Sequence, residues 1–199
     1  MKITVLTSNQ PRHNYLINSL SKICTHLYVI QEVGNHYSYT NKYVQNNLYT
    51  KYFKHVIKAE KKIFEFQNIK SRNISILTIP KGDLNNYSLK LLKSFLKSKH
   101  YIVFGSSIIR GPLLRYLIKK KAINIHMGIS PYYRGADCNF WALYDNNPHL
   151  VGATIHLLSK GLDSGPMLYH AMSKLKTNPY EYTMSTVKAA FHSIAERIK

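Results

Sequence analysis

Two residues in the middle of the chain have side chains suited to acyl chemistry. Asn124 and His126 lie two positions apart, and the apolar residues Ile123, Ile125 and Met127 alternate with them. If this run is a strand, the amide and the imidazole share one face, because side chains alternate along a strand. The amide could donate a hydrogen bond to a developing oxyanion, and the imidazole could hold or move a proton. A strand-end turn braced by polar side chains would use the same residue types, so the pair alone leaves both interpretations open.

A second run of the sequence supplies a carboxylate. Asp163 lies between Gly161 and Gly165, in a stretch typical of a tight loop. Asp-Ser-Gly is ordinary turn chemistry when it stands alone. A carboxylate next to His126 would, however, favour the protonated imidazole and could order a water molecule for proton relay. The hypothesis of a catalytic trio therefore requires two distant runs to converge.

The elements that must position these residues follow from the pattern of apolar residues. Strands are expected over residues 2–8, 26–30, 74–79, 101–104 and 123–127. Helices are expected over residues 14–23, 44–66, 89–96 and 112–118, with a loop over 34–41. The remainder predicts a short helix over 140–144, strands over 152–158 and 167–172, and an amphipathic helix over 181–198. This alternation predicts a single α/β domain over 1–199, a Rossmann-like, mainly parallel sheet flanked by helices, whose strand ends open onto a ligand crevice.

Composition limits the class of protein. A hydrophobic fraction of 45% in 199 residues is enough for a buried core. The apolar run near the N-terminus is too short for a signal peptide, and no stretch approaches the ~18 apolar residues of a membrane span. Cys24 and Cys138 are far apart and do not form a metal-binding pair. We therefore expect a cytoplasmic protein with two free thiols, no metal site and no membrane association.

The net charge of +19 has two explanations. A basic chain can bind nucleic acid or an anionic small molecule, so a nucleic-acid-binding α/β module is one hypothesis. The chain is, however, rich in Lys, Asn, Ile and Tyr, a bias that an AT-rich genome produces without selection for a partner. Its basic residues are also spread thinly, and nucleic-acid sites favour Arg over Lys. An anionic small-molecule substrate uses the charge equally well.

The two runs together resemble a known family. Its pattern is Asn-x-His, a proline-containing loop, Gly-x-Thr-x-His and Asp-x-Gly, which the chain matches in order with Asn124, His126, Pro131, Gly152, Thr154, His156, Asp163 and Gly165. The match resembles the formyltransferases that use 10-formyltetrahydrofolate, which act on glycinamide ribonucleotide, methionyl-tRNA or sugar nucleotides. The resemblance spans residues 101–170 and implies the formyltransferase fold.

The resemblance also implies roles for the trio. Asn124 would polarise the formyl oxygen and stabilise the oxyanion. His126 would assist as a cation or accept a proton. Asp163 would hold His126 and mediate proton transfer through water. From strand alternation, His156 is interpreted as a structural residue or as one that supports the trio without reacting itself.

The resemblance further implies where the two substrates bind. The segment 105–110 resembles the segment whose backbone reads the pterin ring, which gives Ser107, Ile108 and Arg110 as cofactor-binding residues. The loop over 159–163 would form the other wall, with Lys160 and Asp163. The loop after His126 departs from the family's usual Pro-Ser-Leu-Leu-Pro and reads Met-Gly-Ile-Ser-Pro over 127–131, which puts the substrate side in doubt.

Four residues are candidates for binding the acceptor. The aromatic side chains of Tyr132 and Tyr133 could stack on a base or a sugar ring, or they could simply pack the loop. Arg12 and Arg134 could contact a diphosphate, or they could brace the surface. These alternatives stay open at the level of the sequence.

The acceptor amine is the least determined part of the hypothesis. Methionyl-tRNA is disfavoured by length, because such enzymes resemble this chain but carry a further C-terminal domain. Glycinamide ribonucleotide is disfavoured because residues 8–14, after the first strand, contain no glycine for a phosphate-binding loop. A nucleotide-linked amino sugar is the preferred acceptor. A catalytically silent relative remains an alternative, and the sequence leaves open whether the C-terminal helix forms a homodimer.

Overall fold

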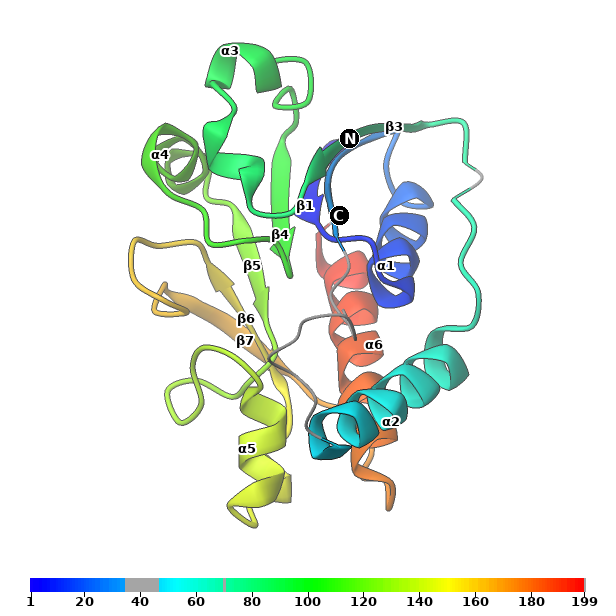
Figure 1. The fold of residues 1–199 in the computed structure, drawn as a ribbon. Coiled ribbons are helices and arrows are strands. Elements are labelled where there is room, and N and C mark those ends of the chain that lie inside the picture. Colours follow the sequence, from blue (N-terminus) through cyan, green and yellow to red (C-terminus); the bar gives the residue numbers. More distant parts are fainter. Residues whose placement is uncertain (35–46, 70, 199) are drawn as a thin grey trace.

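The computed structural model describes residues 1–34, 47–69 and 71–198 and contains a seven-stranded sheet between two layers of helices (Figure 1). The sheet order is β3-β2-β1-β4-β5-β6-β7. Neighbouring strands from β3 to β5 run parallel, and β6 and β7 pair antiparallel. The strands are β1 (Lys2–Thr7), β2 (His26–Val33), β3 (Ile74–Pro80), β4 (His100–Phe104), β5 (Ile123–His126), β6 (Ala153–Leu157) and β7 (Met167–Ala171). The predicted α/β class with a mainly parallel sheet is confirmed.

The helices cover both faces of this sheet (Figure 1). They are α1 (Pro11–Ser21), α2 (Asn47–Phe64), α3 (Leu89–Leu92), α4 (Gly111–Lys119), α5 (Cys138–Tyr144) and α6 (Pro179–Arg197), with short 3₁₀ helices η1 (Asp83–Asn86) and η2 (Pro148–Leu150). In β4, Ile102 and Phe104 pack in the core under α1, α2 and α6, whereas Tyr101 and Val103 pack in the core with η1, α3 and α4. Burial on both faces explains why these strands read as continuous apolar runs.

The change of strand direction after β5 places polar residues opposite one another. In the antiparallel pair of β5 and β6, Asn124 lies opposite His156, and His126 lies opposite Thr154. A register shift between Ile155 and His156 follows in the pairing of β6 with β7. This pairing turns the chain back, so that the loop between β6 and β7 returns to the end of β5.

The expected elements differ from the structure mainly at their ends. The helix expected over 89–96 ends at Leu92, and after it the N–H groups of Phe95 and Leu96 donate to carbonyls three residues back instead of four. The helix expected over 14–23 begins earlier, at Pro11, which suits a first helical position. The expected loop over 34–41 and the start of the helix expected over 44–66 lie largely outside the described residues.

Two further expectations concern the thiols and the membrane. Cys24 and Cys138 are both free. In the described ranges, no helix combines the length and apolarity needed to cross a membrane.

The return of the chain between β6 and β7 depends on Gly165. A Cβ atom at this position would overlap the carbonyl oxygen of Leu157. We expect Gly165→Ala to lower the free energy of unfolding by about 3 kcal/mol, since a backbone carbonyl cannot give way as a flexible side chain can. Urea unfolding followed by circular dichroism measures the loss. Gly82→Ala is the control, because its positive φ of 93° is strained for alanine but no atom lies in the way, which costs about 1–2 kcal/mol. Equal losses for both variants would contradict the steric argument.

Candidate active site

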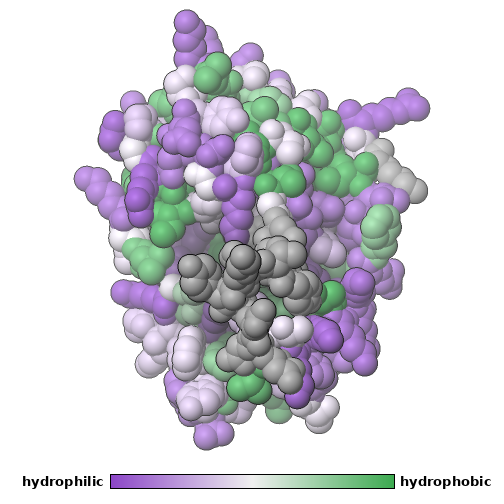
Figure 2. All heavy atoms as spheres, in the orientation of Figure 1, coloured by the Kyte–Doolittle hydropathy of each residue, from purple (hydrophilic) through white to green (hydrophobic). Residues whose placement is uncertain are grey.

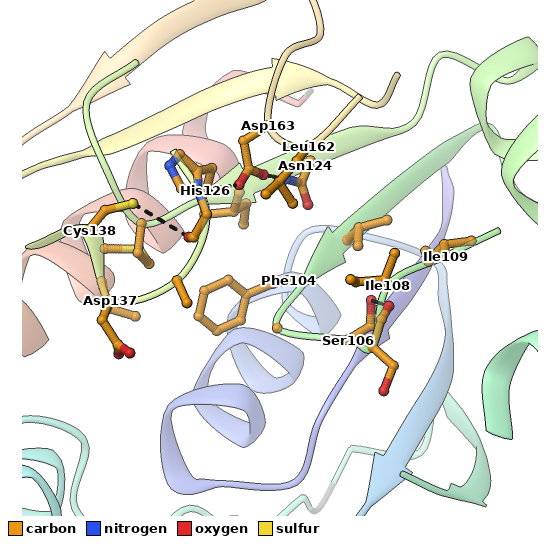
Figure 3. Close-up of a pocket in the computed structure, with 18 of the residues that line it drawn as sticks. Phe104, Ser106, Ile108, Ile109, Asn124, His126, Asp137, Cys138, Leu162 and Asp163 are labelled. Carbon is orange, nitrogen blue, oxygen red and sulfur yellow. Dashed lines mark hydrogen bonds and ion pairs between the residues drawn. The ribbon is translucent and has the colours of Figure 1, made fainter. Parts of the chain in front are cut away.

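A pocket of about 1210 Å³ opens at the carboxyl ends of β4 and β5. Its walls come from the segment 103–111, the loop 158–163, and helices α2, α5 and α6. Ligand pockets for one small molecule measure roughly 300–1,000 Å³, so this pocket has room for more than one ligand. Asn124, His126 and Asp163 all line it, and the predicted convergence of the two runs is present (Figure 3).

The Asp163 carboxylate joins the other two members of the trio. Its Oδ2 lies 3.1 Å from Nδ1 of His126, and its Oδ1 accepts a hydrogen bond of 3.2 Å from Nδ2 of Asn124. The backbone N–H of Gly135 also donates to Oδ2, at 3.1 Å. The carboxylate therefore connects the end of β5 to the loop before α5.

The contacts of His126 favour its doubly protonated form. Nε2 lies 3.0 Å from the carbonyl oxygen of Tyr133, which can only accept a hydrogen bond. Nδ1 faces the Asp163 carboxylate, which is also an acceptor. Both ring nitrogens can be satisfied only when both carry hydrogen. The geometry thus supports an imidazolium–carboxylate pair in a side chain that is 5% exposed.

His156 contacts two members of the trio directly, Asn124 and Asp163. Its Nδ1 lies 2.9 Å from the carbonyl oxygen of Leu157 and so donates there. In the neutral ring, Nε2 is then an acceptor, and it lies 3.0 Å from Nδ2 of Asn124. This assignment fixes the orientation of the Asn124 amide, whose two hydrogens point to His156 and Asp163.

Burial and hydrogen bonding act in opposite directions on Asp163. Burial alone would raise the pKa of this carboxyl. The charge of His126 and the hydrogen bonds that the carboxylate accepts from Gly135 and Asn124 outweigh burial and hold the pKa of Asp163 below its ordinary value. The group is therefore a carboxylate at neutral pH. The same charge contributes to raising the pKa of the Cys138 thiol to about 11, after burial as the main cause.

The residues predicted to bind the cofactor all line the pocket. Ser107, Ile108 and Arg110 belong to one wall, and Lys160 and Asp163 belong to the loop opposite. In Figure 3, Ile108 lies across the pocket from Asn124 and Asp163. Arg110 and Lys160 are exposed at the rim. Their role in binding remains a prediction.

The residues predicted to bind the acceptor are less close together. Arg12 lines the pocket, but its guanidinium lies 2.8 Å from the buried Glu60 carboxylate. Tyr132, Tyr133 and Arg134 are not among the residues that line the pocket, although the backbone of Tyr133 binds His126. Contact between these four residues and a substrate remains a prediction.

An aromatic wall of the pocket was not predicted from the sequence. Tyr52 of α2 lies between Phe140 of α5 and Tyr180 of α6, with ring centroids 5.7 Å from each. All three rings line the pocket. The spacing of apolar residues identified the helices, but nothing in it indicated that their aromatic faces converge.

Comparison with known proteins agrees with the fold and gives the family. The family model described as formyl transferase matches residues 1–198, and the chain belongs to this family. A solved phosphoribosylglycinamide formyltransferase from Anaplasma phagocytophilum shares the fold, with a TM-score of 0.65 at 16% identity over 100% of this chain and 84% of that one. The formyltransferase PseJ from Anoxybacillus kamchatkensis, solved with a formamido sugar nucleotide and tetrahydrofolate, gives a TM-score of 0.52 at 17% identity over 100% of this chain and 76% of that one.

Curated relatives match shorter segments. A methionyl-tRNA formyltransferase from Thermodesulfovibrio yellowstonii is 35% identical over 80 residues, 40% of this chain and 25% of the relative. A formyltetrahydrofolate deformylase from Arabidopsis thaliana is 28% identical over 109 residues, 54% of this chain and 32% of the relative. The matched segments thus span a third or less of these proteins.

The lowered pKa of Asp163 predicts a pH-dependent contribution to stability. A carboxyl whose folded pKa is depressed stabilises the fold fully above its unfolded pKa of about 3.9, and loses this contribution as the pH falls through the lower folded value. We expect the difference in unfolding free energy between wild type and Asp163→Asn to shrink when urea denaturation is moved from pH 6 to pH 3. Asp83→Asn is the matched control. A difference that grows at pH 3 would contradict this account.

Proposed function

We propose that the chain transfers a formyl group from 10-formyltetrahydrofolate to a primary amine, the amino group of a nucleotide-linked amino sugar. The observation that carries the proposal is the convergence of Asn124, His126 and Asp163 in one pocket large enough for two substrates. Membership of the formyl transferase family supports the reaction class.

The wall over 105–110 suits the folate donor. Its apolar side chains, Ile108 and Ile109, flank backbone groups of the kind that a pterin edge can pair with. Arg110 and Lys160 stand exposed at the rim of this end, where cations would attract the carboxylates of a folate tail. When bound, the donor supplies the activated one-carbon group.

The trio can serve the transfer through charge and hydrogen bonding. Attack by the amine places negative charge on the formyl oxygen, and preorganised donors stabilise such charge. Asn124 can donate to that oxygen only by releasing His156 or Asp163, since both amide hydrogens are engaged. His126 contributes positive charge nearby. Asp163 is a weak base because its pKa is lowered, so its role is to hold the imidazolium and order water for proton transfer.

The opposite end of the pocket supports an acceptor with an uncharged ring next to its amine. This end is lined by Tyr52, Phe140 and Tyr180, and the nearby Arg12 is already paired with Glu60. Aromatic faces pack well on the C–H face of a sugar or on a base. The phosphates of a nucleotide sugar would then lie outside, where α2 exposes lysines at positions 51, 54 and 58.

Hydrolysis is the second candidate, favoured by the match to a formyltetrahydrofolate deformylase. In that reaction water replaces the amine as acceptor, and formate is released. The same pocket and trio could perform it. The size of the aromatic end argues for an organic acceptor, because water needs no such wall.

Nucleic-acid binding has less support from the structure. Hydrophilic side chains are spread over the visible face of the molecule rather than gathered into one region (Figure 2). A salt-sensitive association with random oligonucleotides, together with absence of folate binding, would favour this alternative.

The decisive experiment is a screen of amine-bearing nucleotides with 10-formyltetrahydrofolate. Absorbance follows release of tetrahydrofolate, and mass spectrometry separates a formylated amine from free formate. A formylated sugar nucleotide supports the proposal, whereas formate release without any amine supports the hydrolase. No turnover and no folate binding would reject both.

Loss of a trio member is expected to slow turnover strongly. Asn124→Ala and Asp163→Asn should each reduce kcat by at least ~100-fold, because each removes one preorganised group that stabilises developing charge or holds the imidazolium. Rates of tetrahydrofolate release by purified variants measure the effect. Asn68→Ala and Asp83→Asn, away from the pocket, are matched controls that should keep wild-type rates. Near-normal transfer by both trio variants would reject the assignment.

A further inference from the structure

We propose that Glu32 is a positioning residue for the donor end of the pocket: its buried carboxylate holds the wall over 105–110 in the shape that binds the pteridine. This inference rests on the proposed function. Glu32 does not line the pocket and touches the wall only from behind, through its contact with Ser107.

Glu32 is an acidic residue in an unusual environment. It lies near the end of β2 and is 1% exposed. One carboxylate oxygen, Oε1, accepts a hydrogen bond of 2.9 Å from the backbone N–H of Gly82, after β3. The other, Oε2, accepts one of 2.5 Å from the backbone N–H of Ser107, after β4. A single side chain on β2 thus fastens the loop after β3 and the loop after β4, two strands that β2 and β1 separate in the sheet.

The wall needs such anchors because it belongs to no helix or strand. It begins at Gly105 and is followed by Gly111, and both glycines have positive φ angles, of 59° and 61°. Its far end is held by Asn85, whose Oδ1 accepts from the N–H of Arg110 and whose Nδ2 donates to the carbonyl of Ile108, both at 2.7 Å. Glu32 and Asn85 therefore fix three backbone groups of the wall from outside the pocket.

A carboxylate is the side chain that this position requires. Both of its oxygens only accept, and hydrogen bonds to a charged acceptor are roughly twice as strong as neutral ones. A glutamine would direct an NH₂ donor at one of the two backbone N–H groups. An aspartate would be one methylene too short to reach both loops at once. The N–H of Ile108 and the backbone groups of Ile109 make no hydrogen bond to another residue in the described part of the chain, and they keep their direction only while Ser107 is held.

The test compares binding with turnover in Glu32→Gln. We expect the dissociation constant for tetrahydrofolate, measured by fluorescence quenching, and the KM for 10-formyltetrahydrofolate to rise about ten-fold, the loss expected for one strong hydrogen bond. The kcat and the KM for the acceptor should stay within about three-fold of wild type. Asn85→Ala should raise the same two donor constants, and Glu196→Gln, which removes an exposed charge on α6, should change neither.

Other outcomes would overturn the inference, and they distinguish its failure from failure of the proposed function. If wild type binds tetrahydrofolate and both Glu32→Gln and Asn85→Ala bind it equally well, the positioning role is wrong and the proposed function stands. A fall in kcat in both variants, with unchanged affinity for the donor, would also overturn the positioning role. If Glu32→Gln does not fold, the exposed Asn85→Ala variant decides alone. Failure of wild type to bind folate would reject the proposed function together with this inference.

Discussion

The structure depends on one partly buried carboxylate, Asp163, at the centre of its pocket. A charge removed from water must be paired and hydrogen bonded, or its burial costs several kcal/mol. Asp163 satisfies this requirement through Asn124, His126 and the N–H of Gly135. These partners come from β5 and from the loop before α5, so the requirement itself brings three separate segments together. His126 faces two acceptors, the carboxylate on one side and the Tyr133 carbonyl on the other, so both ring nitrogens are satisfied when both carry hydrogen.

The sheet explains why this carboxylate reaches the strand ends. In an open α/β sheet, ligands bind beyond the carboxyl ends of the strands, where the direction of chain crossing changes. Here β1 lies between β2 and β4, and α1 and α4 leave on opposite faces. His13 and Gly105 meet at this point, where a Cβ on the glycine would collide with the imidazole. The antiparallel β6 and β7 then return the chain, so that Asp163 closes the crevice from the side.

The sequence could predict the parts of this arrangement that depend on local pattern. Period-two spacing correctly placed Asn124 and His126 side by side, and the alternation of apolar segments gave the sheet class. The position of Asp163 came from the resemblance to a family, because turn residues carry no signal of what they approach. The contact between His156 and Asn124 arises from antiparallel register across 32 residues, which local pattern does not show.

Backbone contacts and distant ion pairs were beyond prediction for a different reason. The Tyr133 carbonyl and the Gly135 N–H act through atoms that every residue has, so residue types cannot reveal them. Arg12 was a candidate either for contact with a diphosphate or for bracing the surface, and the sequence does not show that Glu60, 48 positions away, pairs with it. Residue types alone cannot reveal this ion pair between Arg12 and Glu60, because the fold brings the two residues together.

The chain has few acidic residues, and some of them hold the loops around the pocket. The chain has nine Asp and Glu residues, and three of them, Glu32, Glu60 and Asp163, are largely buried around the pocket. Each accepts a hydrogen bond from a backbone N–H: Glu32 from two loops, Glu60 from Arg12, and Asp163 from Gly135. The excess of lysine stays at the surface, where it can attract anionic substrates over distances of about 10 Å. Negative charge is thus used inside to fix loops whose shape the pocket needs, and positive charge is used outside, where position matters less.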